Sequence, residues 1–177
     1  MKFLAISGSV RKGSLNTSLL RAAAELVPED VTMDIRTLDG IELLDPNTLE
    51  NGFPDLVNKL ALEIKQADAL VLASPEFNYS VTAAMKNVID WLSIHPEKPL
   101  KNKPTALMSA SPSGLGGARA QYQLRQMLIY PDVKVMAVPE VMVGNAFERF
   151  TTKGELTDDN TKALIKQQMQ VLKDMCA

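Results

Sequence analysis

The chain has 177 residues, of which 46% are hydrophobic and 23% charged, and its formal net charge is −2. These values are typical of a globular protein long enough to bury a core, and they exclude a disordered chain and a strongly basic nucleic-acid-binding surface. The single cysteine, Cys176, and the single histidine, His95, exclude an internal disulfide, a multi-cysteine metal site and a catalytic triad. We therefore assign no catalytic role to His95 and expect Cys176 to be an inert thiol.

No stretch approaches the ~18 apolar residues that a membrane-spanning helix needs. The amino-terminal run Phe3–Ile6 reaches the polar residues Ser7–Ser9 too soon to form the core of a signal peptide. We expect a soluble, cytoplasmic protein with neither a membrane nor nucleic acid among its partners.

Five short apolar runs predict β-strands, and they alternate with longer amphipathic stretches that predict helices. Three runs are almost continuously apolar, as in strands covered on both faces, whereas the run around Met33 alternates with polar residues and is expected nearer a sheet edge. The five runs cover residues 3–6, 31–35, 69–73, 105–110 and 133–138.

This regular alternation predicts an α/β fold, in which right-handed crossovers join a parallel sheet covered by helices on both faces. Five such units suit a flavodoxin-like three-layer sandwich with a five-stranded parallel sheet of order 2-1-3-4-5. We expect residues 1–177 to form a single domain of this kind. Ligands of such sheets lie at the carboxyl ends of the strands, so the loops after the first, third and fourth strands are the candidates for chemistry.

The connection Leu38–Asp55 is the one stretch that fits this pattern poorly. It is long for a strand-to-helix connection, and loops of this length usually have a function or cover another part of the protein. It contains two prolines and the apolar residues Ile41, Leu43, Leu44 and Phe53.

The loop after the first strand, Gly8–Ser18, offers what a phosphate monoester needs. It combines the guanidinium of Arg11, backbone amides at a helix start, and the hydroxyls of Ser9, Ser14, Thr17 and Ser18. A serine- and glycine-rich turn with a helix cap would look similar, so the interpretation depends on the position after the first strand. No Gly-Lys-Ser/Thr triplet ends the run, which excludes a Walker loop.

The loop after the third strand reads Ser74-Pro75-Glu76-Phe77-Asn78-Tyr79-Ser80. Pro75 keeps the preceding residue extended, so the turn leaves the sheet sharply and presents an aromatic ring beside an amide. This pair suits a flat heterocycle, although one aromatic residue in such a loop often only covers the core.

The loop after the fourth strand runs from Ser111 through Gly114, Gly116 and Gly117 into a helix. Glycines allow close approach of a ligand, and amides at a helix start favour negative charge. The run from Gly114 nearly matches the dinucleotide-binding pattern. Because its sixth position is Arg119 and only one strand follows, we set that interpretation aside.

The chain resembles the NAD(P)H-dependent FMN reductases, and most closely the bacterial quinone, chromate and azo-dye reductases, in three motifs. These are Gly8-Ser9-x-Arg11-x-x-Ser14-x-Asn16, Pro75-Glu76-Phe77-Asn78-Tyr79-Ser80, and Ser111 with Gly116-Gly117-Ala118-Arg119. The resemblance extends over essentially the whole chain. It fails at Phe77, where Tyr is the commoner residue of the family, and at Thr82, where Pro is usual.

The resemblance implies that the first loop binds the FMN phosphate, that the second lies along the isoalloxazine ring, and that the third contacts the pyrimidine end of that ring. No metal and no catalytic side chain is implied, because the flavin carries the chemistry. The FMN-binding residues implied are Ser9, Arg11, Ser14, Asn16 and Thr17 in the first loop, Glu76, Phe77, Asn78 and Tyr79 in the second, and Ser111, Gly114, Gly116 and Gly117 in the third.

The activity implied is two-electron, ping-pong transfer from NADPH or NADH through FMN to small acceptors: quinones, chromate, azo compounds or free flavin. Two alternatives stay open. One is a flavodoxin-type carrier of single electrons, and the other is an FMN-binding protein without enzymatic activity. Flavodoxins commonly have a threonine-rich phosphate loop and a strongly acidic surface, which this chain lacks.

The resemblance also implies a homo-oligomer, a dimer or a tetramer, with the flavin near the subunit boundary. Arg119 and Tyr122 are one helical turn apart, and Glu140 follows the predicted fifth strand, so we expect all three at the flavin edge of the sheet. Together with Tyr79 they are the predicted interface contacts. The alternative is an Arg–Glu surface pair within one subunit, worth under ~1 kcal/mol.

Overall fold

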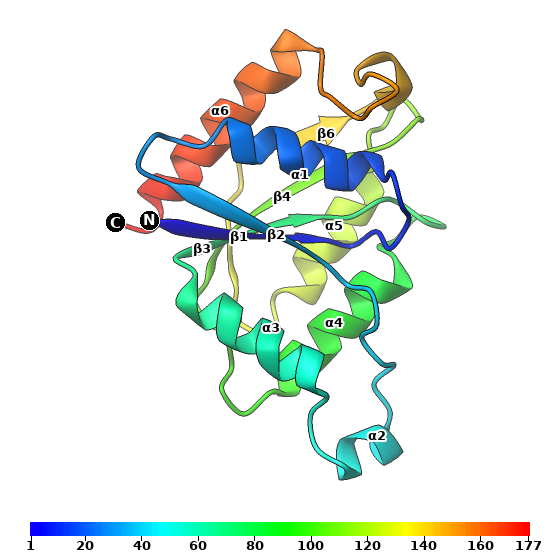
Figure 1. Ribbon diagram of the computed structural model, residues 1–177, viewed down its shortest axis with the longest axis vertical. Coiled ribbons are helices and arrows are strands. Elements are labelled where there is room, and N and C mark those ends of the chain that lie inside the picture. The colour runs from blue at the N-terminus through cyan, green and yellow to red at the C-terminus, as the bar shows by residue number, and fades with distance from the viewer.

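The structure, a computed structural model, describes residues 1–177, and its parallel sheet lies between two layers of helices (Figure 1). The buried strands β1 (Lys2–Ser7), β3 (Ala69–Ala73) and β4 (Pro104–Ala110) form the centre of the sheet, and the partly exposed β2 (Thr32–Thr37) is an edge strand. The strand order is β2-β1-β3-β4-β5, with parallel pairing throughout. The predicted fold class and strand order are confirmed.

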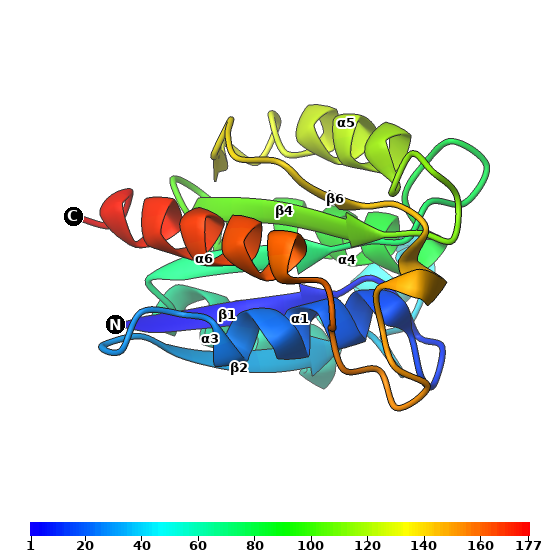
Figure 2. The same ribbon diagram turned by 90° about the horizontal axis from the view of Figure 1, so that it is seen from above.

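Helices cover both faces of the sheet (Figure 2). One face carries α1 (Leu15–Glu25) and α6 (Asp159–Asp174), and the other carries α3 (Asp55–Gln66), α4 (Ala83–Ile94) and α5 (Ala118–Met127). Successive residues of β1 enter opposite cores, because side chains alternate across a strand. This two-sided burial explains why the central strands are continuous apolar runs. None of the helices combines the length and the apolar character needed to cross a membrane.

The fifth strand differs from the prediction of residues 133–138. β5 (Lys134–Val135) has only two residues, and β6 (Val141–Val143) resumes parallel pairing with β4. From the pair Thr105–Val135 to the pair Met108–Val141 the chain advances 141 − 135 = 6 residues while β4 advances 108 − 105 = 3. Pro139 lies in this excursion and has no N–H for a strand ladder.

This excursion corrects the expected place of Glu140. Glu140 comes directly before β6, whereas the chain reaches the carboxyl edge of the sheet only after Val143. Glu140 does follow β5, as predicted, but the prediction that it emerges at the carboxyl edge is wrong.

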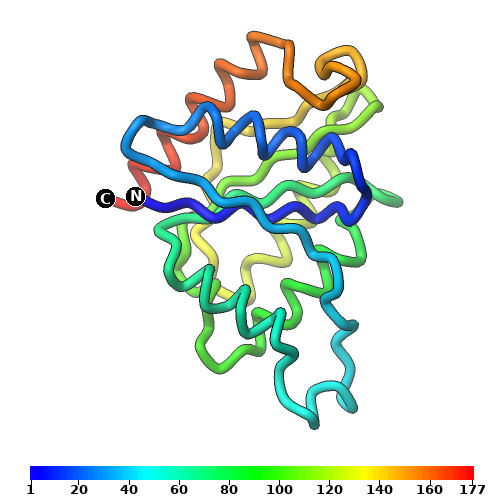
Figure 3. The backbone as a smooth tube through the Cα atoms, in the orientation of Figure 1, coloured from blue at the N-terminus to red at the C-terminus, as the bar shows by residue number.

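The long segment Leu38–Asp55 contains the short helix α2 (Pro46–Glu50) and extends away from the sheet (Figure 3). Its first half is anchored to α4. Both the Asn87 side-chain amide, at 2.9 Å, and the indole N–H of Trp91, at 2.8 Å, donate to the Glu42 carbonyl. Trp91 is completely buried where it meets this segment, so of the two roles left open for the segment, a function or a cover, the structure shows a cover.

Aromatic contacts hold the second half of the segment. Phe53 packs edge-on against Trp91 and His95, with ring centroids 5.7 and 4.8 Å apart. Leu43, in contrast, is 72% exposed. The apolar residues of this segment are thus only partly covered by their own chain.

His95 is buried at the carboxyl end of α4, and both of its ring nitrogens form hydrogen bonds. Nε2 donates to Oδ1 of Asn58 at 3.2 Å, and Nδ1 accepts from the Glu97 amide at 3.2 Å. Burial lowers the pKa of His95; Glu97 partly opposes this effect, and Lys65 adds to it. A protonated ring would place an N–H at Nδ1 against the amide N–H of Glu97. The neutral ring therefore stabilises this junction.

We expect the free energy of unfolding to fall as the pH is lowered from about 6.5 towards 5. In this range His95 takes up a proton in the unfolded chain, where its pKa is ordinary. In the folded chain its pKa is lower, so it takes up less. The free energy of unfolding therefore falls by at most about 1.4 kcal/mol per pH unit. Urea unfolding of wild type and His95→Gln across this range measures the effect. The variant should show a shallower dependence on pH, and identical slopes would contradict this role for His95.

Candidate functional site

The loop between β1 and α1 is held at both ends. The Gly8 amide donates to the Ala73 carbonyl at 2.7 Å, and the Gly8 carbonyl accepts from the Thr82 hydroxyl at 2.6 Å. Ser14 caps α1 by accepting from the Asn16 amide at 3.2 Å. Thr82 also caps α4, so the residue that departs from the family pattern ties the first loop to the start of that helix.

Two residues predicted to bind FMN use their side chains inside the protein. The Asn16 side chain donates to the Ala110 carbonyl at 2.9 Å and accepts from the Ala110 amide at 3.0 Å. The Thr17 hydroxyl is 2.8 Å from the Ser7 hydroxyl. Asn16 therefore joins the first loop to the end of β4. What both residues can offer a ligand is their backbone at the start of α1.

The second loop closes in a tight turn. Phe77 and Ser80 exchange two backbone hydrogen bonds of 2.9 and 3.0 Å, and both central residues are left-handed, with φ of 49° at Asn78 and 67° at Tyr79. Asn tolerates this conformation, but for Tyr it costs on the order of 1–3 kcal/mol. The turn leaves the rings of Phe77 and Tyr79 exposed at the carboxyl edge of the sheet.

Glu76, Arg119 and Tyr79 form a connected group beside this turn. Glu76 accepts from the Arg119 side chain at 3.0 Å and from its amide at 3.2 Å, and the guanidinium lies 3.9 Å from the Tyr79 ring centroid. Glu140 pairs instead with Arg125 at 3.5 Å. The alternative, a pair of Arg119 with Glu140 within one subunit, is therefore absent, and their contact across an interface stays a prediction.

Two of the three glycines in the third loop pack against their own chain. A Cβ on Gly116 would lie 2.6 Å from the Met142 carbonyl carbon, and one on Gly117 would lie 2.9 Å from the Ser109 side chain. Both are left-handed. Of the three, only Gly114 has open space where a side chain would begin. The need for glycine at positions 116 and 117 thus comes from the fit of this loop onto β6 and β4.

A cleft of about 530 Å³ lies at the carboxyl edge, where the loops meet. Pockets for small ligands and cofactors usually measure about 300–1,000 Å³. Of the residues predicted to bind FMN, its walls include Ser9, Arg11, Ser14, Asn16, Glu76, Phe77 and Ser111. Thr17, Asn78, Tyr79, Gly114, Gly116 and Gly117 lie outside its walls.

Six residues that line this cleft lie beyond the three loops and were missed by sequence reasoning. They are Arg21 on α1, Phe147 in the short 3₁₀ turn Ala146–Glu148, and Thr151, Thr152, Lys153 and Gly154 beyond that turn. The prediction considered the loops after the first, third and fourth strands only. The pairing of β6 with β4 brings the following segment to the same edge, and the break at Pro139 concealed that pairing.

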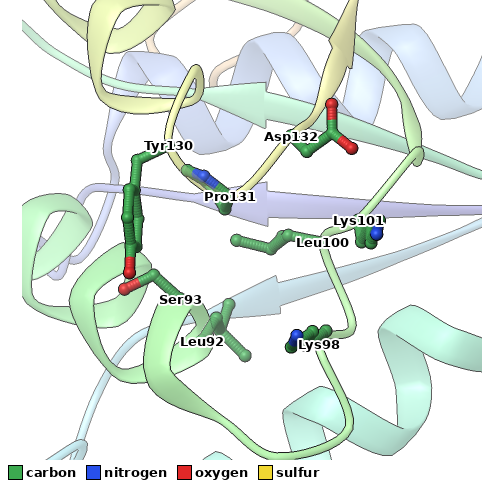
Figure 4. Close-up of a pocket in the computed structure, with 8 residues that line it drawn as sticks. All are labelled: Leu92, Ser93, Lys98, Leu100, Lys101, Tyr130, Pro131 and Asp132. Atoms are coloured by element: carbon green, nitrogen blue, oxygen red, sulfur yellow. The ribbon is translucent and has the colours of Figure 1, made fainter.

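A smaller pocket of about 240 Å³ lies at the opposite edge of the sheet, before β4 and β5 (Figure 4). Lys98, Lys101 and the ring of Tyr130 line it around Leu100. Ligands of parallel α/β sheets bind at the carboxyl ends of the strands. The larger cleft is therefore the candidate site.

Comparisons with known proteins show which family the chain matches. A family model described as NADPH-dependent FMN reductase matches residues 1–148. The chain is 44% identical over 172 residues to an NAD(P)H-dependent FMN reductase of Pseudomonas aeruginosa, covering 97% of this chain and 93% of that protein. It is 39% identical over 164 residues to a quinone reductase of Escherichia coli, covering 91% of this chain and 87% of that protein.

Among solved structures, FerB, a flavoenzyme NAD(P)H:acceptor oxidoreductase of Paracoccus denitrificans, superposes with a TM-score of 0.88 at 26% identity. The match covers 99% of this chain and 96% of that chain. The family match includes all three predicted loops and ends before Thr151.

Replacing Asn16 by Ala would leave the buried amide and carbonyl of Ala110 without their partner. We expect the free energy of unfolding to fall by about 1–3 kcal/mol, the cost of unpaired buried polar groups. Urea unfolding without added ligand measures the change, with the exposed residue Asn160 of α6, replaced by Ala, as the control. An unchanged midpoint in Asn16→Ala would show that these bonds do not join the two loops.

Proposed function

Because the chain belongs to the NADPH-dependent FMN reductase family, we propose that it holds FMN in the cleft at the carboxyl edge and uses NADPH or NADH to reduce small acceptors. The observation that carries the proposal is that the phosphate-type loop Ser9–Ser14 and the aromatic turn at Phe77 line one cleft. When bound, FMN supplies the redox chemistry, taking two electrons from the nicotinamide and passing two to the acceptor.

The residues lining the cleft fit FMN from end to end. The hydroxyls of Ser9 and Ser14, the guanidinium of Arg11 and the amides at the start of α1 would hold the phosphate. Phe77 offers an exposed aromatic face to a flat ring, and Ser111 offers a hydroxyl to its polar end.

The protein itself would bind the flavin and orient it. Glu76 is the only acidic residue that lines the cleft, and both of its carboxylate oxygens accept hydrogen bonds from Arg119. Two hydrogen bonds of this kind fix the carboxylate, and with it the second loop, against the start of α5. Its role is therefore positional.

Quinones are the acceptors that we propose first, since the Escherichia coli relative is a quinone reductase. Chromate, azo compounds and free flavin are further small oxidants that we propose. Phe77 is 63% exposed, so its aromatic face would be available to flat acceptors as well as to the flavin.

A flavodoxin-type electron carrier and an FMN-binding protein without activity would use the same cleft. The net charge of −2 gives no strongly acidic surface for docking to a protein partner, and the relatives reduce small molecules. Both observations favour the enzyme.

We expect the purified protein to be yellow and to release FMN, not FAD, on denaturation. NADPH or NADH should bleach the visible absorbance of the bound flavin rapidly, and a quinone should restore it. A flavin that stays oxidised under anaerobic NADPH and NADH would contradict the enzymatic proposal and favour one of the two alternatives. Absence of any FMN affinity would contradict the assignment of the cleft.

We also propose that the working form is a homo-oligomer, a dimer or a tetramer, with α5 at the subunit boundary. Large apolar side chains on or near α5 are more than half exposed, and an interface would remove them from water. They belong to Tyr122, Ile129, Tyr130 and Val138. The stacked pair of Arg119 and Tyr79 and the Arg125–Glu140 ion pair would add polar contacts at its rim.

Sedimentation at micromolar concentration checks this proposal. Wild type should be larger than a monomer, and Ile129→Asp should shift it towards monomer because a charge would be buried in the boundary. Leu62→Asp, which changes another exposed apolar residue, on α3, should not shift it. Glu140→Ala tests that residue alone: an unshifted assembly removes Glu140 from the interface, and a wild-type monomer contradicts the whole proposal.

A further inference from the structure

The cleft collects positive charge that has no partner. Four of the arginines, Arg36, Arg119, Arg125 and Arg149, form ion pairs within the chain. The other two arginines of the sequence, Arg11 and Arg21, form none, and both line the cleft. Lys153, which also forms no ion pair, lines it too.

Lys153 reaches the cleft on the tip of a hairpin, Phe150–Leu156. The two end residues form an antiparallel bridge, the Thr151 amide donates to the Glu155 carbonyl at 2.8 Å, and the Gly154 amide donates to the Thr151 carbonyl at 2.9 Å. These bonds give the tip a defined shape.

Close packing holds this hairpin against α1. Gly154 is left-handed, with φ of 83°, and a Cβ there would lie 2.5 Å from the Ser18 hydroxyl. Figure 2 shows the orange segment turning back beside the start of α1. The tip thus lies next to the turn of α1 that carries Arg21, and both border a neighbouring pocket as well.

The positive charges of Arg21 and Lys153 exceed what one phosphate monoester and the nearby carboxylates would neutralise. A phosphate monoester carries about −1.5 to −2 at neutral pH, which Arg11 together with about half a positive charge at the helix start nearly balances. Glu25 and Glu155 border the neighbouring pocket but pair with neither cation. The Glu155 carboxylate accepts instead from the Thr151 hydroxyl at 3.3 Å.

We propose that Arg21 and Lys153 form a second phosphate subsite at the α1 end of the cleft. The subsite rests on the proposed function of the cleft, and the hairpin that carries Lys153 lies outside the residues that the family model matches. Its ligand is a phosphate monoester, either that of FMN, held from a second side, or the 2′-phosphate of NADPH.

Arg21→Ala, Lys153→Ala and the double variant test the subsite. Flavin fluorescence gives the Kd of the apoprotein for FMN and for riboflavin, and steady-state rates give the KM for NADPH and NADH with FMN saturating. If the subsite holds the FMN phosphate, each variant raises the Kd for FMN about tenfold and leaves riboflavin unchanged. If it holds the 2′-phosphate, each raises the KM for NADPH about tenfold and leaves NADH unchanged.

Lys166→Ala is the matched control, because Lys166 is an exposed lysine on α6 outside the cleft. It should keep the wild-type constants, and Arg21→Lys should recover part of the loss. Arg21→Ala and Lys153→Ala variants that keep all four constants within about twofold of wild type overturn the subsite. An equal loss of FMN and riboflavin overturns it as well, because such a loss does not depend on phosphate.

Failure of the proposed function would be seen separately, as a wild-type protein that binds no FMN. Inorganic phosphate is then the probe, at matched ionic strength. It should raise the Tm of wild type, and by less in the double variant, because a ligand stabilises the state that binds it. An equal rise in both proteins would overturn the subsite.

Discussion

The two hydrogen bonds between the Asn16 side chain and the backbone of Ala110 set the geometry on which the site depends. β1 and β4 are not neighbours, because β3 lies between them, so sheet pairing alone leaves the loops that follow them independent. One buried side chain on α1 spans that gap. The cleft is therefore shaped before any ligand arrives, and a ligand that binds it does not have to order the first and third loops relative to each other.

The parts of the fold that follow from local pattern were predictable. Continuous apolar runs located β1, β3 and β4, and strand–helix alternation gave the order of the sheet. The break between β5 and β6 was not predictable from periodicity, because residues 133–138 keep an apolar character while Pro139 interrupts the ladder. Because residues 133–138 were predicted as one strand, Glu140 was misplaced, and the hairpin that brings Lys153 to the cleft was not foreseen.

Residue type alone did not separate ligand contacts from internal ones. Short polar side chains and glycines suit a phosphate loop, yet Asn16 and Thr17 bind their own chain, and Gly116 and Gly117 are needed for packing. Both uses favour the same amino acids, since each needs a small donor or a free amide at a helix start. Long-range partners such as Arg119 for Glu76 depend on the folded chain and have no signal in spacing.

Trp91 is the only tryptophan of the chain, and it lies fully buried where α4 meets the segment Leu38–Asp55. Its emission therefore reports on a single place. Detachment of that segment would expose the indole and break its hydrogen bond to Glu42, changing the colour and intensity of the emission while the sheet stays intact. Because the segment and the cleft have separate anchors, this intrinsic optical probe can follow motion of one part of the molecule without a label and without a flavin.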